Sequence, residues 1–304
     1  MTLLAETPSF SIVVPTRNRP QLLHNCLQGI ADQKFCEQLE QVIVVDNGDL
    51  MNGTETVVER FSAHLPVSYL YASPPGVSRA RNLGLQHSQS DITVFIDDDE
   101  IPGANWFSEM SAPFNSDKIR PDIVAGNYSP QWEAQRPKWL TDEYLGVYSV
   151  SLPYGDEPRF LSAKDWVLEG NIGVKTDLIK SAGGFDENLG RHRDSLVSGE
   201  GIIYQRLVEA GAKIFYNPKC LVKHLIHANR LDRKWLQKRM FASGITHAAH
   251  EKNRHLRGKQ IPSVRVNLGA LARVDINSLE GDDLLHFVQV FEIMGYVLRK
   301  KNIL

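Results

Sequence analysis

The stretch DITVFIDDDE, from Asp91 to Glu100, decides how the rest of the chain is interpreted. Its first half, Ile92 to Ile96, is a β-branched and aromatic run typical of a buried strand. Four consecutive carboxylates follow, and such a cluster is costly unless it faces water or a cation. Ligands of open α/β sheets bind beyond the carboxyl ends of the strands, where oxygen atoms suit a hard divalent cation. The pattern therefore predicts a cation site or, as the simpler alternative, a solvated acidic turn.

Strand and helix patterns alternate in front of this stretch. The expected strands are Phe10–Val14, Val42–Val45 and Val67–Tyr71, and the expected helices include Thr54–Leu65 and Ser78–Gln86. Alternation at this spacing predicts a Rossmann-like, doubly wound α/β sheet that is mostly parallel and has helices on both faces. The sequence has no GxGxxG after the first strand and no P-loop, so it lacks the usual NAD and ATP signatures.

Polar groups follow three of the predicted strands: Pro15-Thr16-Arg17, Asp46-Asn47 and Asp97 to Asp99. In a parallel sheet they share one edge, which makes a nucleotide-sized site. Turn backbone and Asp46 suit a base there, and the acidic group suits ribose and metal. Arg79 and Arg81 precede the acidic stretch, either to neutralise phosphates or as surface arginines of an amphipathic helix.

The overall composition narrows the class of protein. The chain has 304 residues, 42% hydrophobic and 23% charged, and a net charge of −2, which predicts no nucleic-acid partner. No apolar segment follows a basic start, and no run of about 18 uncharged apolar residues occurs, so we expect a cytoplasmic protein. The three cysteines, Cys26, Cys36 and Cys220, lack metal-site spacing and are expected to be reduced.

Six motifs follow one another in a recognisable order: PTRNRPQLLHNCLQGI, VIVVDNGD, GVSRARNLGL, FIDDDE, GNIGVKTDLIKSAGGFDENLG and SGEGIIYQRLVEAGAKIFYNPKCLVKH. Together they resemble the family 2 glycosyltransferases of the GT-A fold, from about Ser9 to about His227. The resemblance implies a catalytic domain at residues 1–228, with a nucleotide-binding half at 1–100 and an acceptor half at 101–228. Residues 229–304 are then a helical C-terminal extension.

The resemblance also implies a nucleoside-diphosphate sugar as donor and Mn²⁺ or Mg²⁺ as cofactor. The residues that it assigns to the donor are Pro15, Thr16, Arg17, Asp46, Arg81, Asp97 and Asp98. Among these, Asp46 recognises the base and Asp97 contacts the ribose side. The implied metal ligands are Asp99 and His224, although a histidine at the place of His224 can also simply cap a strand end.

One departure from the family concerns the catalytic base. The motif usually reads Gly-Glu-Asp, whereas this chain has Ser198-Gly199-Glu200-Gly201. Glu200 is the carboxylate left in the motif and the implied base, with Asp194 the next candidate. Alternatively, Glu200 caps the helix that begins at Ile202, because acidic residues favour helix N-termini.

The implied function is a metal-dependent, inverting transfer of a sugar, with UDP favoured, to an acceptor hydroxyl in polysaccharide or cell-surface glycan biosynthesis. Two other functions remain open. A sugar nucleotidyltransferase would need a glycine-rich phosphate loop, and PTRNRP is not one. A catalytically weak or inactive nucleotide-sugar-binding scaffold protein of the same fold is compatible with Gly201. The acceptor can be a glycan, a lipid-linked molecule or a small molecule.

The other segments allow two interpretations each. Residues Ser129 to Phe160 form an aromatic loop with several prolines. Its aromatic side chains either form a platform for the acceptor or pack the loop against the domain. Just after it, Asp165, Trp166 and Glu169 can contact sugar or acceptor.

The C-terminal part is basic and then helical. From Lys219 to Lys259 its pattern predicts an amphipathic basic helix that either contacts the inner face of a membrane or docks on the core. Asp282 to Leu304 is expected to be a closing helix that packs on the domain or forms a homodimer.

Overall fold

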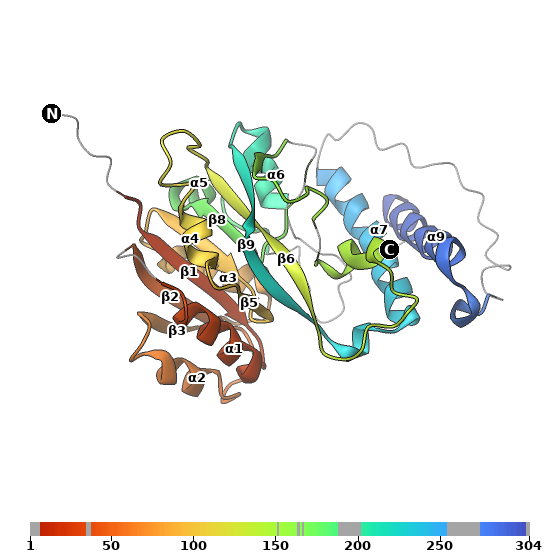
Figure 1. The fold of residues 1–304 in the computed structure, drawn as a ribbon, viewed down its shortest axis with the longest axis horizontal. Coiled ribbons are helices and arrows are strands. Elements are labelled where there is room, and N and C mark those ends of the chain that lie inside the picture. Colours follow the sequence, from red (N-terminus) through yellow and green to blue (C-terminus); the bar gives the residue numbers. More distant parts are fainter. Residues whose placement is uncertain are drawn as a thin grey trace. The chain divides into compact units, whose positions relative to one another are not determined.

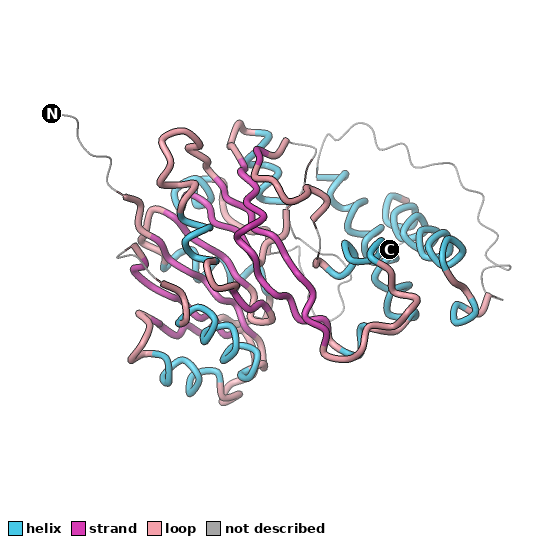
Figure 2. Tube along the Cα trace, in the orientation of Figure 1, coloured by secondary structure: helices cyan, strands magenta, loops and turns pink. Residues whose placement is uncertain are grey.

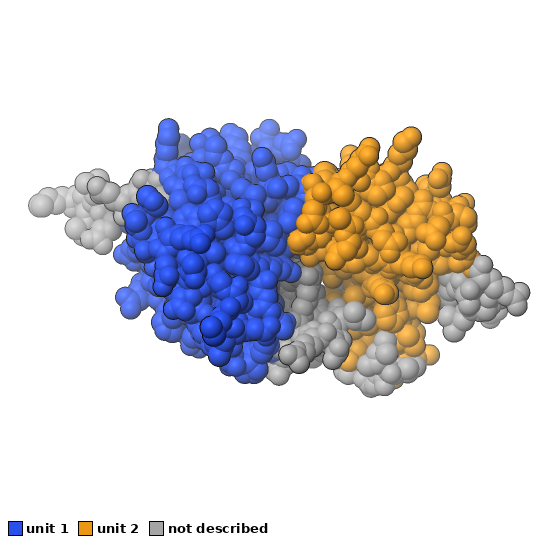
Figure 3. Space-filling model, turned by 90° about the horizontal axis from the view of Figure 1, so that it is seen from below, with its two compact units in different colours: residues 1–131, 149–190, 199–225 blue, residues 132–148, 191–198, 226–304 orange. Residues whose placement is uncertain are grey.

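The structure is a computed structural model that describes residues 7–34, 38–150, 152–162, 165, 167–187, 202–253 and 274–301. The chain divides into two compact units, coloured separately in Figure 3. The sheet unit comprises Met1–Gln131, Ser149–Gly190 and Gly199–Leu225. The helical unit comprises Trp132–Tyr148, Arg191–Ser198 and Ile226–Leu304.

The N-terminal half of the sheet is parallel, in the order β3-β2-β1-β4. Its strands are β1 (Phe10–Thr16), β2 (Leu39–Asp46), β3 (Val67–Tyr71) and β4 (Ile92–Ile96). The helices between them are α1 (Pro20–Ala31), α2 (Thr54–Phe61) and α3 (Val77–His87). Every residue of β1 and β4 is buried, as the continuous apolar runs of a parallel sheet require. The predicted α/β sheet is confirmed.

The C-terminal half of the same sheet is antiparallel and continues β4 in the order β8-β6-β9-β5, with β7 also paired to β9. These strands are β5 (Glu100–Pro102), β6 (Ile123–Trp132), β7 (Arg159–Phe160), β8 (Asn171–Lys175) and β9 (Ile214–Ile226). Figure 1 shows the long strands β6 and β9 side by side. Because β5 follows the acidic stretch directly, its pairing with β9 sets Glu100 opposite His224.

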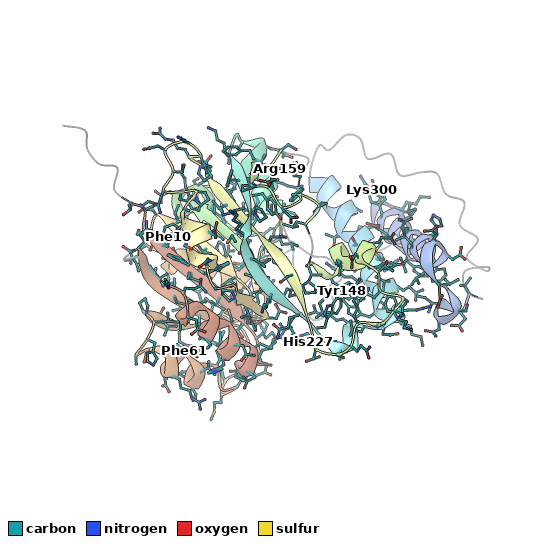
Figure 4. The ribbon with its side chains drawn as sticks, viewed as in Figure 1. Phe10, Phe61, Tyr148, Arg159, His227 and Lys300 are labelled. Carbon is teal, nitrogen blue, oxygen red and sulfur yellow. The ribbon has the colours of Figure 1, made fainter. Side chains whose placement is uncertain are left out.

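The core of the sheet unit lies between the strands and helices α1, α2, α3, α4 (Trp106–Ser111), α5 (Thr176–Ser181) and α6 (Ile202–Glu209). Phe10, labelled in Figure 4, meets Phe107 edge-on at 5.4 Å between ring centroids. Asn171 is a buried polar group with its bonding capacity used: it accepts from Trp106 Nε1 (2.8 Å) and donates to the carbonyls of Asn127 and Cys220. This amide therefore connects β8 with β6, β9 and α4.

The helical unit contains η1 (Asp142–Tyr148), η2 (Ala228–Arg230), α7 (Arg233–Asn253), η3 (Ile276–Ser278) and α9 (Gly281–Lys300). Helices α7 and α9, both cyan in Figure 2, touch at their backbones. A Cβ atom on Gly244 would lie 1.8 Å from the carbonyl oxygen of Glu292, and one on Gly295 would lie 2.1 Å from that of Phe241. Glycine is needed at both positions because no side chain fits there. The predicted closing helix thus packs on α7.

Arg233 at the start of α7 is buried, contrary to the exposed basic face that the sequence suggests. Its guanidinium donates to the carbonyl oxygens of Ile276, Asn277 and Leu279 and lies over the ring of Trp139. Lys234 and Lys238 remain exposed. Over the part of the chain that the structure describes, no helix has the length and apolar character needed to cross a bilayer.

Candidate active site

The carboxyl ends of β1, β2 and β4 meet at one edge of the sheet, as the sequence predicts. Thr16, the last residue of β1, is in register with Asp46, the last residue of β2. On its other side, the Thr16 hydroxyl donates a 2.7 Å hydrogen bond to Asp98 Oδ2. Pro15 is buried in β1, and Arg17 lies half-buried just beyond it. These strand ends are 30 to 80 positions apart in sequence, and the parallel register alone brings them together.

The four carboxylates after β4 differ in exposure. The side chain of Asp97 is 32% exposed, whereas those of Asp98 and Asp99 are 6% and 10% exposed. Burial, with the charge of Asp99 adding to it, raises the pKa of Asp98 to about 7. Burial also raises the pKa of Glu100 well above the ordinary glutamate value, and the charges of Asp97 and Asp99 contribute. The alternative of a freely solvated acidic turn is therefore wrong.

The sequence analysis gave no role to Arg19, but this arginine at the N-terminus of α1 lies beside the acidic turn. Its Nη1 lies 3.2 Å from Asp98 Oδ1 and 3.2 Å from Asp99 Oδ2. Burial alone lowers the pKa of Arg19, but the charges of these two carboxylates outweigh it and raise the pKa above the ordinary value. An arginine three residues after the first strand could have pointed to this contact, because it starts a helix at the same sheet edge.

His224 and Asp99 face each other with groups that can bind a metal. His224 Nδ1 lies 3.2 Å from the carbonyl oxygen of Ser149. A carbonyl only accepts, so Nδ1 carries the proton of this hydrogen bond. On the other side of the ring, Nε2 lies 3.7 Å from Asp99 Oδ1. An imidazole nitrogen and a carboxylate oxygen both ligate divalent cations, so the pair fits such an ion, and the Ser149 carbonyl orients the ring.

The fit concerns two ligands and does not extend to a complete cage. Within the described residues, no set of three or more histidine, cysteine, aspartate or glutamate side chains is arranged to hold a metal ion. A cation at Asp99 and His224 would therefore take its remaining ligands from elsewhere, as Mg²⁺ sites do when they use substrate phosphates and water.

Arg81 is a buried cation under the acidic turn, so the alternative of a surface arginine is wrong. Its side chain is 3% exposed, and Nη2 lies 2.7 Å from Asp97 Oδ1. Nη1 forms a second, short ion pair with the buried carboxylate of Glu169. Although burial lowers the pKa of Arg81, the charges of Asp97 and Glu169 raise it above the ordinary value. Arg79 instead pairs with Glu187 at 2.9 Å.

Gly170, next to Glu169, lets the chain pass close to these carboxylates. A Cβ atom there would lie 2.3 Å from Glu100 Oε1 and 2.9 Å from Asp97 Oδ2. A larger residue there would force the carboxylate groups of Glu100 and Asp97 to shift. The glycine therefore serves the site through packing.

Asp46 is 1% exposed, and its carboxylate is already hydrogen-bonded. It accepts from the Gly48 N–H (2.8 Å), from Asn52 Nδ2 (2.9 Å to Oδ2) and from the hydroxyl of Tyr69 (3.3 Å). Asn52 also donates to the side-chain oxygen of Asn18 at 3.1 Å. The predicted base-reading residue thus sits behind Asn52, which the sequence analysis missed because its partners are set by the loop geometry.

Comparison with known proteins now decides the family. The family described as Glycosyl transferase family 2 matches residues 11–168, more than half of the chain. This chain belongs to glycosyl transferase family 2. It is a glycosyltransferase, as the motifs predicted.

Relatives of this glycosyltransferase agree with that assignment. The glucosyl-dolichyl phosphate glucuronosyltransferase of Haloferax volcanii is 27% identical over 270 residues, which are 81% of this chain and 82% of that protein. The mannosyltransferase PcManGT of Pyrobaculum calidifontis, solved with GDP-Man and Mn²⁺, has a TM-score of 0.60 at 18% identity. The match covers 98% of this chain and 74% of the PcManGT chain. S. aureus TarS 1–349, solved with UDP, has a TM-score of 0.57 at 16% identity, and the match covers 97% of this chain and 91% of the TarS chain. The structural likenesses show a GT-A-like fold.

Several predicted residues of the glycosyltransferase lie outside the described residues. They are Glu200, Gly201, Asp194 and Trp166. Asp165 is described and accepts hydrogen bonds from the backbone and hydroxyl of Ser162, so it closes a local turn. The sequence analysis proposed that Glu169 contacts sugar or acceptor; in the structure, Arg81 Nη1 already donates to one oxygen of its carboxylate.

The aromatic loop predicted at Ser129 to Phe160 has three buried tyrosine side chains. Tyr144, Tyr148 and Tyr154 are each less than 9% exposed. Tyr148, labelled in Figure 4, stacks on Trp235 at 4.8 Å within the helical unit and donates to the carbonyl oxygen of Arg230. These three rings therefore contribute to packing. Trp132 and Trp139 are half-buried.

Proposed function

We propose that this glycosyltransferase moves a sugar from a nucleoside-diphosphate sugar to an acceptor hydroxyl, depends on a divalent metal and inverts the anomeric centre. The observation that carries the proposal is the convergence of Thr16, Asp46, Asp99 and His224 at the carboxyl edge of the parallel strands. Ligands of open α/β sheets bind at this edge.

Asp99 and His224 are proposed to hold Mn²⁺ or Mg²⁺, which when bound stabilises the negative charge that develops on the diphosphate. The Ser149 carbonyl orients the ring of His224 for this role. Pro15, Thr16 and Arg17 are proposed to line the nucleotide.

The carboxylates next to this metal pair are proposed to act on the donor. Asp97, which is part-exposed, is proposed to contact the ribose side of the donor, and Asp98 is proposed to bind the donor as well. Arg81 fixes the orientation of Asp97 through their ion pair.

Glu200 is proposed as the base that removes the proton from the acceptor hydroxyl. Attack from the side opposite the diphosphate then needs one base and no covalent intermediate, which is inversion. Glu200→Gln should abolish turnover and leave donor binding intact, as measured by product formation and by donor titration. Unchanged turnover would remove Glu200 from this role.

UDP is the proposed nucleotide, and a lipid-linked acceptor in glycan assembly is the proposed acceptor class. The UDP complex of TarS and the dolichyl-phosphate substrate in the name of the Haloferax volcanii relative support these choices. Manganese in the PcManGT complex supports the metal. We also retain as proposals the boundary at residue 228, a cytoplasmic location, membrane contact by the basic helix and a homodimer.

The test is thermal stability against nucleoside diphosphates and their sugars, each with Mn²⁺ and with chelator. A ligand at about 100 times its Kd should add about 2.7 kcal/mol to the free energy of unfolding. We expect a shift with UDP that needs Mn²⁺ and disappears in Asp99→Asn. No shift with any nucleotide would favour a degenerate site that does not bind a donor.

A further inference from the structure

Arg19 occupies the side of the acidic turn that the other partners leave open. Thr16 holds Asp98 Oδ2, and His224 faces Asp99 Oδ1. The second oxygen of each carboxylate, Asp98 Oδ1 and Asp99 Oδ2, faces the same atom, Arg19 Nη1, at 3.2 Å in both cases. A single guanidinium nitrogen thus bridges the two adjacent aspartates.

The two arginines at the acidic turn are held very differently. Arg81 is 3% exposed and fixed between Asp97 and Glu169. Arg19 is 41% exposed, and within the described residues it forms ion pairs with Asp98 and Asp99. Such a long, part-exposed side chain can change rotamer without unfolding its surroundings, whereas the buried Arg81 cannot. Arg81 is therefore a permanent counter-ion, and Arg19 is an exchangeable one.

We propose that Arg19 is a metal-exchanged donor-binding residue: it neutralises Asp98 and Asp99 in the donor-free enzyme and re-pairs with the donor diphosphate when a divalent cation binds. The inference rests on the proposed function, since it assumes the metal at Asp99. A guanidinium and a divalent cation repel each other when they share the same carboxylates. The displaced guanidinium finds a new anion in the diphosphate, to which arginine binds through its planar fork.

The first test measures Mn²⁺ binding to the full chain without nucleotide, by the loss of the free Mn²⁺ signal in electron paramagnetic resonance. Arg19→Gln should bind Mn²⁺ about fivefold to tenfold more tightly than wild type, because the competing charge is gone. Arg19→Lys keeps the charge and should stay within about twofold of wild type.

Arg17→Gln is the matched control, because it removes the same charge two positions earlier. In the described structure Arg17 makes no ion pair with the acidic turn. Its Mn²⁺ affinity should change less than that of Arg19→Gln. Equal changes in the two variants, or no change in either, would overturn the exchange.

The second test uses inorganic pyrophosphate as a probe that has no base or sugar. At saturating Mn²⁺, calorimetric titration should show about tenfold weaker pyrophosphate binding to Arg19→Gln than to wild type. Undiminished pyrophosphate binding would overturn the transfer of Arg19 to the phosphates. Thermal unfolding in chelator verifies that each variant is folded.

Asp99→Asn separates this inference from the proposed function. If Mn²⁺ binding falls in Asp99→Asn but is the same in Arg19→Gln as in wild type, the metal site stands and the role of Arg19 is wrong. If wild type, Arg19→Gln and Asp99→Asn all fail to bind Mn²⁺, the metal-dependent donor site and the inference built on it are both wrong.

Discussion

At the scale of single residues, the candidate site is organised by side chains that hold other side chains. Asn52 bridges Asp46 and Asn18, so it joins the loop after β2 to the loop after β1. A Cβ atom on Gly48 would lie 2.2 Å from the Asn18 side-chain oxygen, which shows how tightly these two loops pack. The orientation of the Asp46 carboxylate therefore depends on Asn52.

Asn52→Ala should weaken UDP binding and leave Mn²⁺-dependent pyrophosphate binding unchanged. The variant removes the amide that holds Asp46, at a cost of about 1 kcal/mol in stability, while the phosphate side of the site is untouched. Calorimetric titration with the two ligands measures both effects. Equal losses for UDP and pyrophosphate would mean that Asn52 does not act through the base.

At the scale of secondary-structure elements, Asp122 joins three segments of the antiparallel half of the sheet. It precedes β6, accepts a 2.7 Å bond from Lys175 Nζ at the end of β8, and accepts the backbone N–H of Lys213 before β9. Partial burial by itself raises the pKa of Asp122, but the two hydrogen bonds outweigh it and hold the pKa below the ordinary value of 3.8.

Asp122→Asn should lower the Tm at pH 7 by roughly 2–4 °C, if the ionised carboxylate contributes about 1 kcal/mol. A depressed pKa contributes stability above the unfolded value, and that contribution is lost as the pH falls through the lower folded value. The difference from wild type should therefore be full above about pH 4 and shrink below it. Asp117→Asn, on an exposed residue, is the control and should show little change. A pH-independent difference would contradict the assignment.

At the scale of the whole molecule, the described residues proposed for donor and metal all belong to the sheet unit. The helical unit depends on the backbone contact at Gly244 and Gly295. Stability of the helical unit and binding of the donor should therefore respond to different substitutions.

Gly244→Ala should destabilise the protein by about 1–3 kcal/mol, although alanine favours helices, because its Cβ would collide with the Glu292 carbonyl oxygen. Gly146→Ala makes the same change in the same unit where no atom lies within 4 Å, and it should be neutral. Urea denaturation measures stability. Mn²⁺-dependent pyrophosphate binding at 20 °C should stay within about twofold of wild type in both variants. A parallel loss of binding would contradict the separation.

The local patterns of the sequence were enough for the parallel half of the sheet and for the edge at which its strand ends meet. β-Branched runs closed by Pro15, Asp46 and Asp97 marked three strand ends, and βαβ spacing implied that these ends share one edge. Both inferences depend on periodicity and handedness, which operate over short stretches of chain. The motifs also placed the chain in its family.

Only the tertiary structure decided which charges meet. Arg19 and Asp98 are 79 positions apart, and Arg81 and Glu169 are 88 positions apart. Sequence patterns made Arg81 equally suitable for a surface and gave Arg19 no role. Burial and pairing of charges depend on how distant segments pack. An arginine in the same local sequence pattern can be solvated at a protein surface or held between two carboxylates in an interior. The division between an exchangeable and a permanent counter-ion therefore follows from packing alone.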